Sequence, residues 1–283
     1  MSVNLIQTLI AIILYLGAIT VVGIYFARRA NENSAQFFIG GRKLGPWVAA
    51  MSAEASDMSG WLLMGLPGVA YWCGIADAFW TAVGLAIGTY VNWLIVAQRL
   101  RRYSIVASNA ITIPDFFSNR YREGKPVILF FASLFILIFF SVYVGSCFVT
   151  GGKLFSTVFE AEYQTVMILA AIFVVAYTLI GGFLAVCTTD LIQGLVMVFA
   201  LVTVLFVCVA AAGGPSAVMD NVGQIPGFME FFGIAQPQVD ATKTQLLGSA
   251  GEPLFKGAGA YGLLTVVSTM SWGLGYFGMP QVL

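Results

Sequence analysis

A polar stretch interrupts an apolar segment in the first quarter of the chain, and it holds the residues best suited to chemistry. Between Ala55 and Gly68 lie one carboxylate, two serines, three glycines and a proline. Hydrocarbon offers no water to unpaired peptide groups, so a broken helix at that depth needs protein or a solvated cavity around it. An ionisable group there indicates a functional site. Asp57 could therefore ligate an ion, receive a substrate amine or cap the half-helix.

A second apolar segment is interrupted in the same way near the end of the chain. Gly273, Gly275, Gly278 and Pro280 fall within residues 258–283. A pair of Gly/Pro-interrupted spans predicts a secondary-transporter site built from inverted repeats. Glycines can also serve only for close helix packing, but packing alone does not explain a carboxylate in the first break. Carbonyl and hydroxyl oxygens freed at a break suit a hard cation such as sodium.

The composition places the chain among proteins that cross a membrane several times. Of its 283 residues, 59% are hydrophobic and 9% are charged, and none is a histidine. The lack of histidine excludes histidine-ligated haem or zinc and Ser-His or Cys-His catalysis. The carboxylates Glu54, Asp57 and Asp190 are isolated, so we expect no enzyme activity. No filter sequence or ring of charges favours a channel, and we expect no nucleic-acid partner and no obligate protein partner.

Seven segments are long and apolar enough to cross a bilayer as helices. They span residues 6–27, 46–71, 76–98, 126–150, 164–183, 189–212 and 258–283. Of the thirteen basic residues, ten lie in the connections after the first and third segments. Because cytoplasmic loops are enriched in Lys and Arg, we expect a multi-pass protein of the cell membrane with its N-terminus outside.

Two connections between these segments carry expectations of their own. Residues 213–257 form a long polar stretch rich in Gly, Pro and Gln, which predicts an external loop with little regular structure and a short surface helix around 226–233. Residues 109–117 contain a proline and an aromatic pair, which indicates a short interfacial helix. The chain ends inside the last apolar segment, so we expect it to be a fragment of a longer transporter.

Four sequence blocks carry a resemblance to a known family. They are GGR at 40–42, SDMSGWLLMGLPG at 56–68, GGFLAVCTTD at 181–190 and WGLGYFG at 272–278. With them the sequence resembles the sodium/solute symporter family over essentially its whole length, and the second and fourth blocks are similar to its proline-transporting branch.

The resemblance implies an all-α polytopic membrane protein with a five-plus-five inverted-repeat transporter fold, here truncated to about seven transmembrane helices. The chain 1–283 would form a single transmembrane domain. Its parts would be an extra N-terminal helix at 6–27, repeat one at 46–212, the external loop at 213–257 and the first helix of repeat two at 258–283.

The resemblance also implies a sodium site at the first break. The backbone carbonyls of Ala55 and Met58 would ligate the ion, and Asp57, Ser59 and Gly60 would support ion and substrate binding. The hydroxyl-bearing half of the site would lie in a helix of repeat two beyond Leu283.

The implied solute is L-proline, imported with sodium by alternating access. Its pocket would be formed by Asp57, Met58, Trp61, Tyr143, Trp272, Tyr276 and Pro280. Aromatic faces can enclose its ring and attract its ammonium group. Arg42 would act in coupling on the cytoplasmic side, and Asp190 would lie on the inward exit route of the ion. The alternatives are a sodium symporter for another small organic solute, or a solute sensor on the same fold.

The sequence departs from the pattern of that branch in two places. Glu54 stands where related proteins usually have a small residue, three positions before Asp57. Met279 and Gln281 flank Pro280, where a glutamine and a histidine are usual. The second departure bears on solute affinity, because it removes an amide near the pocket.

Overall fold

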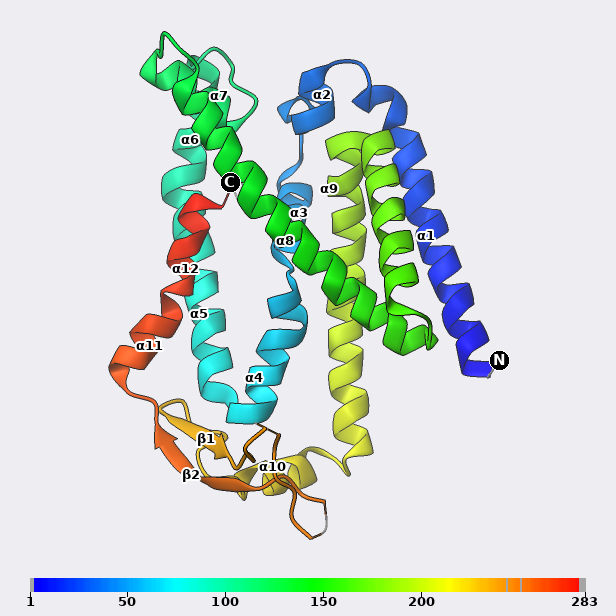
Figure 1. Ribbon diagram of the computed structural model, residues 1–283, viewed down its shortest axis with the longest axis vertical. Coiled ribbons are helices and arrows are strands. Elements are labelled where there is room, and N and C mark those ends of the chain that lie inside the picture. The colour runs from blue at the N-terminus through cyan, green and yellow to red at the C-terminus, as the bar shows by residue number, and fades with distance from the viewer. Residues whose placement is uncertain (1–2, 243, 250, 280–283) are drawn as a thin grey trace. The chain divides into compact units, whose positions relative to one another are not determined.

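A computed structural model describes residues 3–279 apart from 243 and 250 (Figure 1). The chain divides into two compact units, which are described separately below. The first contains residues 1–60 and 100–196, and the second contains residues 61–99 and 197–283. Two helical segments, α6 (Gln98–Val106) and α9 (Tyr163–Ala211), run from one unit into the other.

The first unit is built from helices. Besides parts of α6 and α9, its elements are α1 (Val3–Ala30), α2 (Ser34–Ile39), the 3-10 turn η1 (Gly40–Arg42), α3 (Pro46–Asp57), α7 (Ile113–Tyr121) and α8 (Val127–Phe159). Local sequence explains several of the boundaries. Asn33 caps α2 by accepting from the Gln36 N–H at 2.9 Å, and proline stands in the first turn of α3 and of α7, where its missing N–H costs nothing.

A glycine turn divides α9. Gly182 has a φ of 61° and a ψ of −165°, a combination that favours glycine. The chain turns back on itself at this point (Figure 1). A side chain at this position would also press against Phe37 and the Cβ atom of Ala30. The turn therefore supplies two helices, as expected from the separate apolar segments 164–183 and 189–212.

The second unit contains helices and a small sheet. Besides parts of α6 and α9, its elements are the π-helical turn η2 (Trp61–Gly65), α4 (Leu66–Cys73), α5 (Ile75–Asn92), the π-helical turn η3 (Trp93–Ala97), α10 (Pro215–Gly223), β1 (Gly233–Pro237), β2 (Phe255–Ala260), α11 (Leu263–Met270), α12 (Trp272–Gly275) and the 3-10 turn η4 (Tyr276–Gly278). The strands are antiparallel, with Gly233 opposite Ala260. A small core of Ala76, Tyr261 and Val266 joins this hairpin to α5 and α11.

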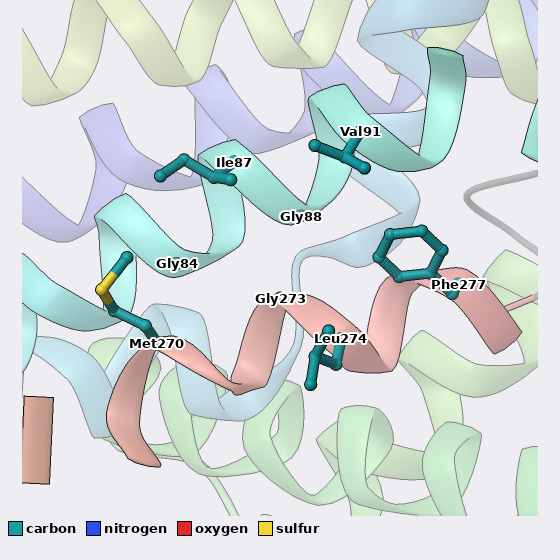
Figure 2. Close-up of a pocket in the computed structure, with 8 residues that line it drawn as sticks. All are labelled: Gly84, Ile87, Gly88, Val91, Met270, Gly273, Leu274 and Phe277. Atoms are coloured by element: carbon teal, nitrogen blue, oxygen red, sulfur yellow. The ribbon is translucent and has the colours of Figure 1, made fainter. Parts of the chain in front are cut away.

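Glycines let α5 lie directly against α11 and α12. A Cβ atom added to Gly84 would collide with the backbone of Met270, and one added to Gly88 would collide with the backbone of Gly273. Figure 2 shows the two helical segments meeting at Gly84, Gly88 and Gly273. This is the small-residue contact common between helices in membranes. An apolar pocket of about 150 Å³ lies along the contact.

Some of the expected membrane spans are long continuous helices, and others are interrupted. Four helical segments in the described part of the chain are long and apolar enough to cross a bilayer: Ile6–Arg28, Ile75–Val106, Val127–Phe159 and Tyr163–Ala211. The turn at Gly182 divides the last of them. The expected segment 46–71 is present as an interrupted helix. In the expected segment 258–283, residues 258–260 belong to β2, and the described helical part comprises α11, α12 and η4. The interruptions were predicted, whereas the seven-helix count and the inverted-repeat arrangement remain proposals.

The connection at residues 213–257 is more ordered than the sequence suggested. The prediction of a short helix around 226–233 is wrong, because the helix in this connection is α10, at Pro215–Gly223. The hairpin of β1 and β2 was not predicted. Its strands are short and glycine-rich, and one contains proline, so neither shows the alternating β-branched pattern by which strands are recognised. The short helix expected near 109–117 is confirmed as α7, with Thr112 as its N-cap.

Candidate functional site

The first helix break lies where the sequence predicted it. α3 ends at Asp57, and Met58 has an extended backbone with φ −62° and ψ 101°. The Met58 N–H donates to the Ala55 carbonyl at 3.2 Å, which closes the last turn of α3. Helical structure resumes at Gly60. The last carbonyls of α3 therefore have no α-helical donors from the residues that follow.

Helix α8 supplies oxygen atoms to this break. The Tyr143 hydroxyl donates to the Ser56 carbonyl at 3.1 Å. Thr150, two turns further along α8, lies so close to Gly60 that a Cβ atom on Gly60 would collide with its hydroxyl. Gly60 is thus required for α8 to approach the break. Carbonyl and hydroxyl oxygens crowded at a helix end form the kind of surrounding that a hard cation prefers.

The two polar residues of the break are both partly buried and engaged. Asp57 and Ser59 each take part in an interaction within the molecule. Glu54 is exposed on the same helix. The structure thus places Asp57 and Ser59, and not Glu54, among the groups enclosed at the break.

Asp190 belongs to a second polar contact on α3. The Ser52 hydroxyl donates to Asp190 Oδ2 at 2.6 Å, and both residues are buried. The contact fixes α9 to α3 five residues before Asp57, which is about 7.5 Å along the helix axis. Ser52 was not recognised from the sequence. The one indication in the sequence was that a serine stands in an apolar helix, where a buried hydroxyl group needs a hydrogen-bonding partner.

Arg42 joins the connection between α2 and α3 to the connection between α6 and α7 by a hydrogen bond. It lies in η1, between α2 and α3, with a φ of 58°. Its guanidinium donates to the carbonyl of Ala110 at 2.8 Å, and Ala110 is buried in the connection between α6 and α7. Arg42 therefore acts on the loops at the start of α3, away from the break at the other end of that helix.

In the second unit two of the expected aromatic residues, Trp61 and Trp272, lie in contact. The rings of Trp61 and Trp272 are stacked, with centroids 5.5 Å apart and planes 7° from parallel. Trp61 is 37% exposed and Trp272 52% exposed, so part of each indole remains open. Tyr276 is buried one turn beyond Trp272. Such rings can hold an apolar ring or a cation on their faces.

The second helix break also has the predicted form. α11 ends at Met270, α12 and η4 add only short turns, and Met279 is extended with φ −88° and ψ 112°. The expected site residue Pro280 lies outside the described residues. The aromatic residues Trp61, Trp272 and Tyr276 all belong to the second unit, whereas Ala55 to Gly60 and Tyr143 belong to the first.

Three residues near the hairpin form a polar cluster that the sequence did not reveal. The Tyr261 hydroxyl donates to Asp77 Oδ1 at 2.5 Å and lies 2.6 Å from the Thr269 hydroxyl. The cluster fastens the end of β2 and the last turn of α11 to the first turn of α5. The one available signal was Asp77 itself, since acidic residues favour the first turn of a helix.

Comparison with known proteins places the chain in a family of transporters. It matches the sodium:solute symporter family over residues 37–283 and belongs to that family. The name of the family gives sodium as the coupled ion, in agreement with the expectation from the sequence.

Curated relatives are similar over nearly all of this chain. Sodium/proline symporters of Staphylococcus aureus strains JH9, Mu3 and NCTC 8325 are each 41% identical to it over 277 residues, or 98% of the chain. The aligned region is 49% of each relative. The chain thus spans about half the length of the curated relatives it matches.

Proposed function

We propose that the intact protein is a symporter that imports L-proline together with sodium by alternating access. The observation that carries the proposal is the break after Asp57, where the Ser56 carbonyl accepts from the Tyr143 hydroxyl and Thr150 lies beside Gly60. Membership in the sodium:solute symporter family and the similarity to sodium/proline symporters support the choice of ion and solute.

Sodium would bind at the first break. The carbonyls of Ala55 and Met58 would ligate it, and Asp57, Ser59 and Gly60 would support the unwound backbone. The Ala55 carbonyl accepts one hydrogen bond from Met58, and a carbonyl oxygen has a second lone pair for an ion. The chemistry of these donors therefore fits a sodium ion. Further ligands would come from a part of the protein outside this chain.

Proline would be held by the aromatic residues. The ring faces of Trp61, Trp272 and Tyr276 would enclose the pyrrolidine ring and attract the ammonium group, at about 0.5–2 kcal/mol for each cation–π contact. Tyr143 and Pro280 would shape the pocket. Asp57 and Met58 would complete it from the first break, so ion and solute would share one segment of the chain. Such sharing provides a physical basis for cooperative binding.

The driving force is sufficient for concentrative uptake. One positive charge moving inward through 100 mV releases about 2.3 kcal/mol, and a tenfold sodium gradient adds about 1.4 kcal/mol. Together these would sustain a solute gradient of several hundredfold for one sodium per solute. Asp190, bonded to Ser52 on α3, would lie on the inward route of the ion, and Arg42 would couple the cytoplasmic connections to the movement of α3.

The proposed topology follows the distribution of basic residues. The N-terminus would be outside the cell membrane, and the helices of this chain would provide an extra N-terminal helix, repeat one and the start of repeat two. A five-plus-five inverted-repeat fold would then be completed by the other half of the protein.

Uptake of labelled proline into proteoliposomes that contain the full-length protein tests this proposal. Uptake should saturate with proline, require an inward sodium gradient, and rise when the interior is made negative. A potassium gradient of equal size is the control. Uptake that is independent of sodium contradicts symport, uptake of a different solute corrects the substrate, and binding without uptake indicates a sensor.

A further inference from the structure

Asn92, at the end of α5, is a buried amide that the proposed function does not use. Its side chain has 0% exposure, and among the residues that the structure describes neither its amide nitrogen nor its amide oxygen has a hydrogen-bonding partner. Buried polar side chains are nearly always paired, and an unpaired one destabilises the conformation that contains it. An amide with no partner among the described residues is suited to pair with a group that another conformation brings to it.

Asn92 extends the glycine contact of α5. Gly84, Gly88 and Asn92 are four residues apart, so they share one face of the helix. Along that face Gly84 meets Met270 and Gly88 meets Gly273. One further step of the same size places Asn92 level with η4 (Tyr276–Gly278).

The lining of the pocket supports this register. Val91, the neighbour of Asn92, lines the same pocket as Phe277 of η4, and Figure 2 shows their side chains on the facing segments. Asn92 thus lies at the height of the second break.

Both segments leave α-helical geometry at this level. The π-helical turn η3 follows Asn92 directly on α5, and η4 is a 3-10 turn followed by extended backbone at Met279. The next residue is Pro280, which has no N–H to donate, so carbonyls at the end of η4 lose a helical donor. The Tyr276 carbonyl accepts a long hydrogen bond from the Met279 N–H, at 3.5 Å. An asparagine amide offers two N–H donors to carbonyls at this helix end.

We propose that Asn92 is a positioning residue for the second break. Its amide donates to the carbonyls at the end of η4 when the transporter has bound sodium and solute, whereas in the present conformation it has no partner among the described residues. The bound conformation thereby gains hydrogen bonds that the present one lacks, which shifts the equilibrium toward it. The inference rests on the proposed function, because the bound conformation is the one reached with sodium and proline.

The test compares Asn92→Leu with Thr81→Val in the full-length protein. Leucine removes the unpaired amide, so the thermal midpoint should stay equal or rise, while proline uptake falls about tenfold with a raised KM, the effect of losing a hydrogen bond in the bound state alone. Thr81 is also buried on α5 but lies about three turns before Asn92, so Thr81→Val should keep uptake within about twofold. Asn92→Ser, which retains a donor, should recover part of the uptake.

Hydrogen exchange of a peptide covering residues 270–279 provides a readout that does not depend on transport. Wild type should gain protection there when sodium and proline are added, and Asn92→Leu should not. Unchanged uptake and KM in Asn92→Leu would overturn the inference, and so would a lowered thermal midpoint with equal protection in both proteins. Absence of sodium-dependent uptake in wild type would count against the proposed function instead, and exchange with sodium alone would then decide the role of Asn92.

Discussion

The two helix breaks of this chain differ in what surrounds them. At the first, helix-end carbonyls meet the Tyr143 hydroxyl, and Thr150 approaches through the space left by Gly60. At the second, Gly273 lies against the glycines of α5, and Trp272 stacks on Trp61. Oxygen atoms in fixed positions suit an ion, whereas glycine contacts and ring faces suit a solute and a helix that moves. We infer from this comparison that two interruptions that are similar in sequence are suited to different chemistry.

The contacts of the breaks also differ in how firmly they fix a helix. α3 is tied by the hydrogen bond from Ser52 to Asp190 and by the one from Tyr143 to the Ser56 carbonyl. The contact of α12 with α5 is made by backbone at Gly84, Gly88 and Gly273. Because glycines carry no side chains that could interlock, we expect this contact to tolerate small shifts between the two segments. We therefore expect the first break to define the ion site and the second to change shape during transport.

The largest effect should come from the carboxylate of the first break. Asp57→Cys should lower sodium-driven uptake by about 100-fold or more, because it removes a group that supports the ion-binding backbone. The measurement is initial uptake of labelled proline by the full-length protein.

The matched control is Asp220→Cys, on the exposed surface of α10, which should leave uptake within about twofold. Asp77 is less suitable as a control, because it accepts a hydrogen bond from Tyr261. Equal losses in Asp57→Cys and Asp220→Cys would break the distinction between the first break and the rest of the molecule.

The next effect concerns the glycine contact of the second break. Gly88→Ala should destabilise the protein by about 1–3 kcal/mol, because the added methyl group collides with the Gly273 backbone. Gly145→Ala is the control on α8, where a Cβ atom meets nothing within 4 Å. It should be neutral or stabilising by up to about 1 kcal/mol. Unfolding in detergent measures both, and equal effects would mean that α5 and α12 are not in contact.

A smaller effect is expected from the tie between α3 and α9. Ser52→Ala removes the hydrogen bond to the buried Asp190 carboxylate and should cost about 1–3 kcal/mol, toward the lower end if water enters. Ser146→Ala deletes an exposed hydroxyl that bonds only within α8 and should change stability by less than about 0.5 kcal/mol. If Ser52→Ala is as neutral as this control under the same unfolding assay, α3 is not held as we describe.

The smallest effect concerns the cap of α8, the helix that brings Tyr143 to the first break. Glu123 accepts from the backbone N–H groups of Ile128 and Leu129 at 2.7 and 3.2 Å. Desolvation raises the pKa of Glu123, but hydrogen bonds from Ser118 and from the start of α8 outweigh it, so the pKa lies below its ordinary value. The contribution to stability is therefore present at neutral pH and lost as the pH falls through the lowered pKa.

Glu123→Gln should accordingly be slightly less stable than wild type at pH 7, and the difference should vanish on acidification below the pKa of Glu123. Thermal midpoints at a series of pH values measure this. A difference that persists unchanged in acid would show that the carboxylate charge is not what caps the helix.

Much of the site could be predicted because the bilayer imposes strict rules on sequence. Asp57 and the glycines near it stood out, since hydrocarbon excludes such residues unless they have a role. The hairpin at β1 and β2 and the helix α10 lie in the polar loop, where no such rule applies. The roles of Ser52, Thr150 and Asn92 could not be predicted either. Each role depends on which helices pack against each other, and a single polar residue in an apolar segment does not reveal what it will contact.

The central claim, that Ser59 at the first break supports the sodium ion and Trp272 at the second break holds the solute, is tested by the binding constants of two variants. In the full-length protein, Ser59→Ala should raise the sodium concentration for half-maximal uptake about three- to tenfold while leaving the proline KM at saturating sodium unchanged. Trp272→Leu should raise that KM by a similar factor, through loss of a ring face, and leave the sodium requirement unchanged at saturating proline. The proposed division of roles is wrong if both variants change the same one of the two constants. It is also wrong if Ser59→Ala changes the proline KM and Trp272→Leu changes the sodium requirement.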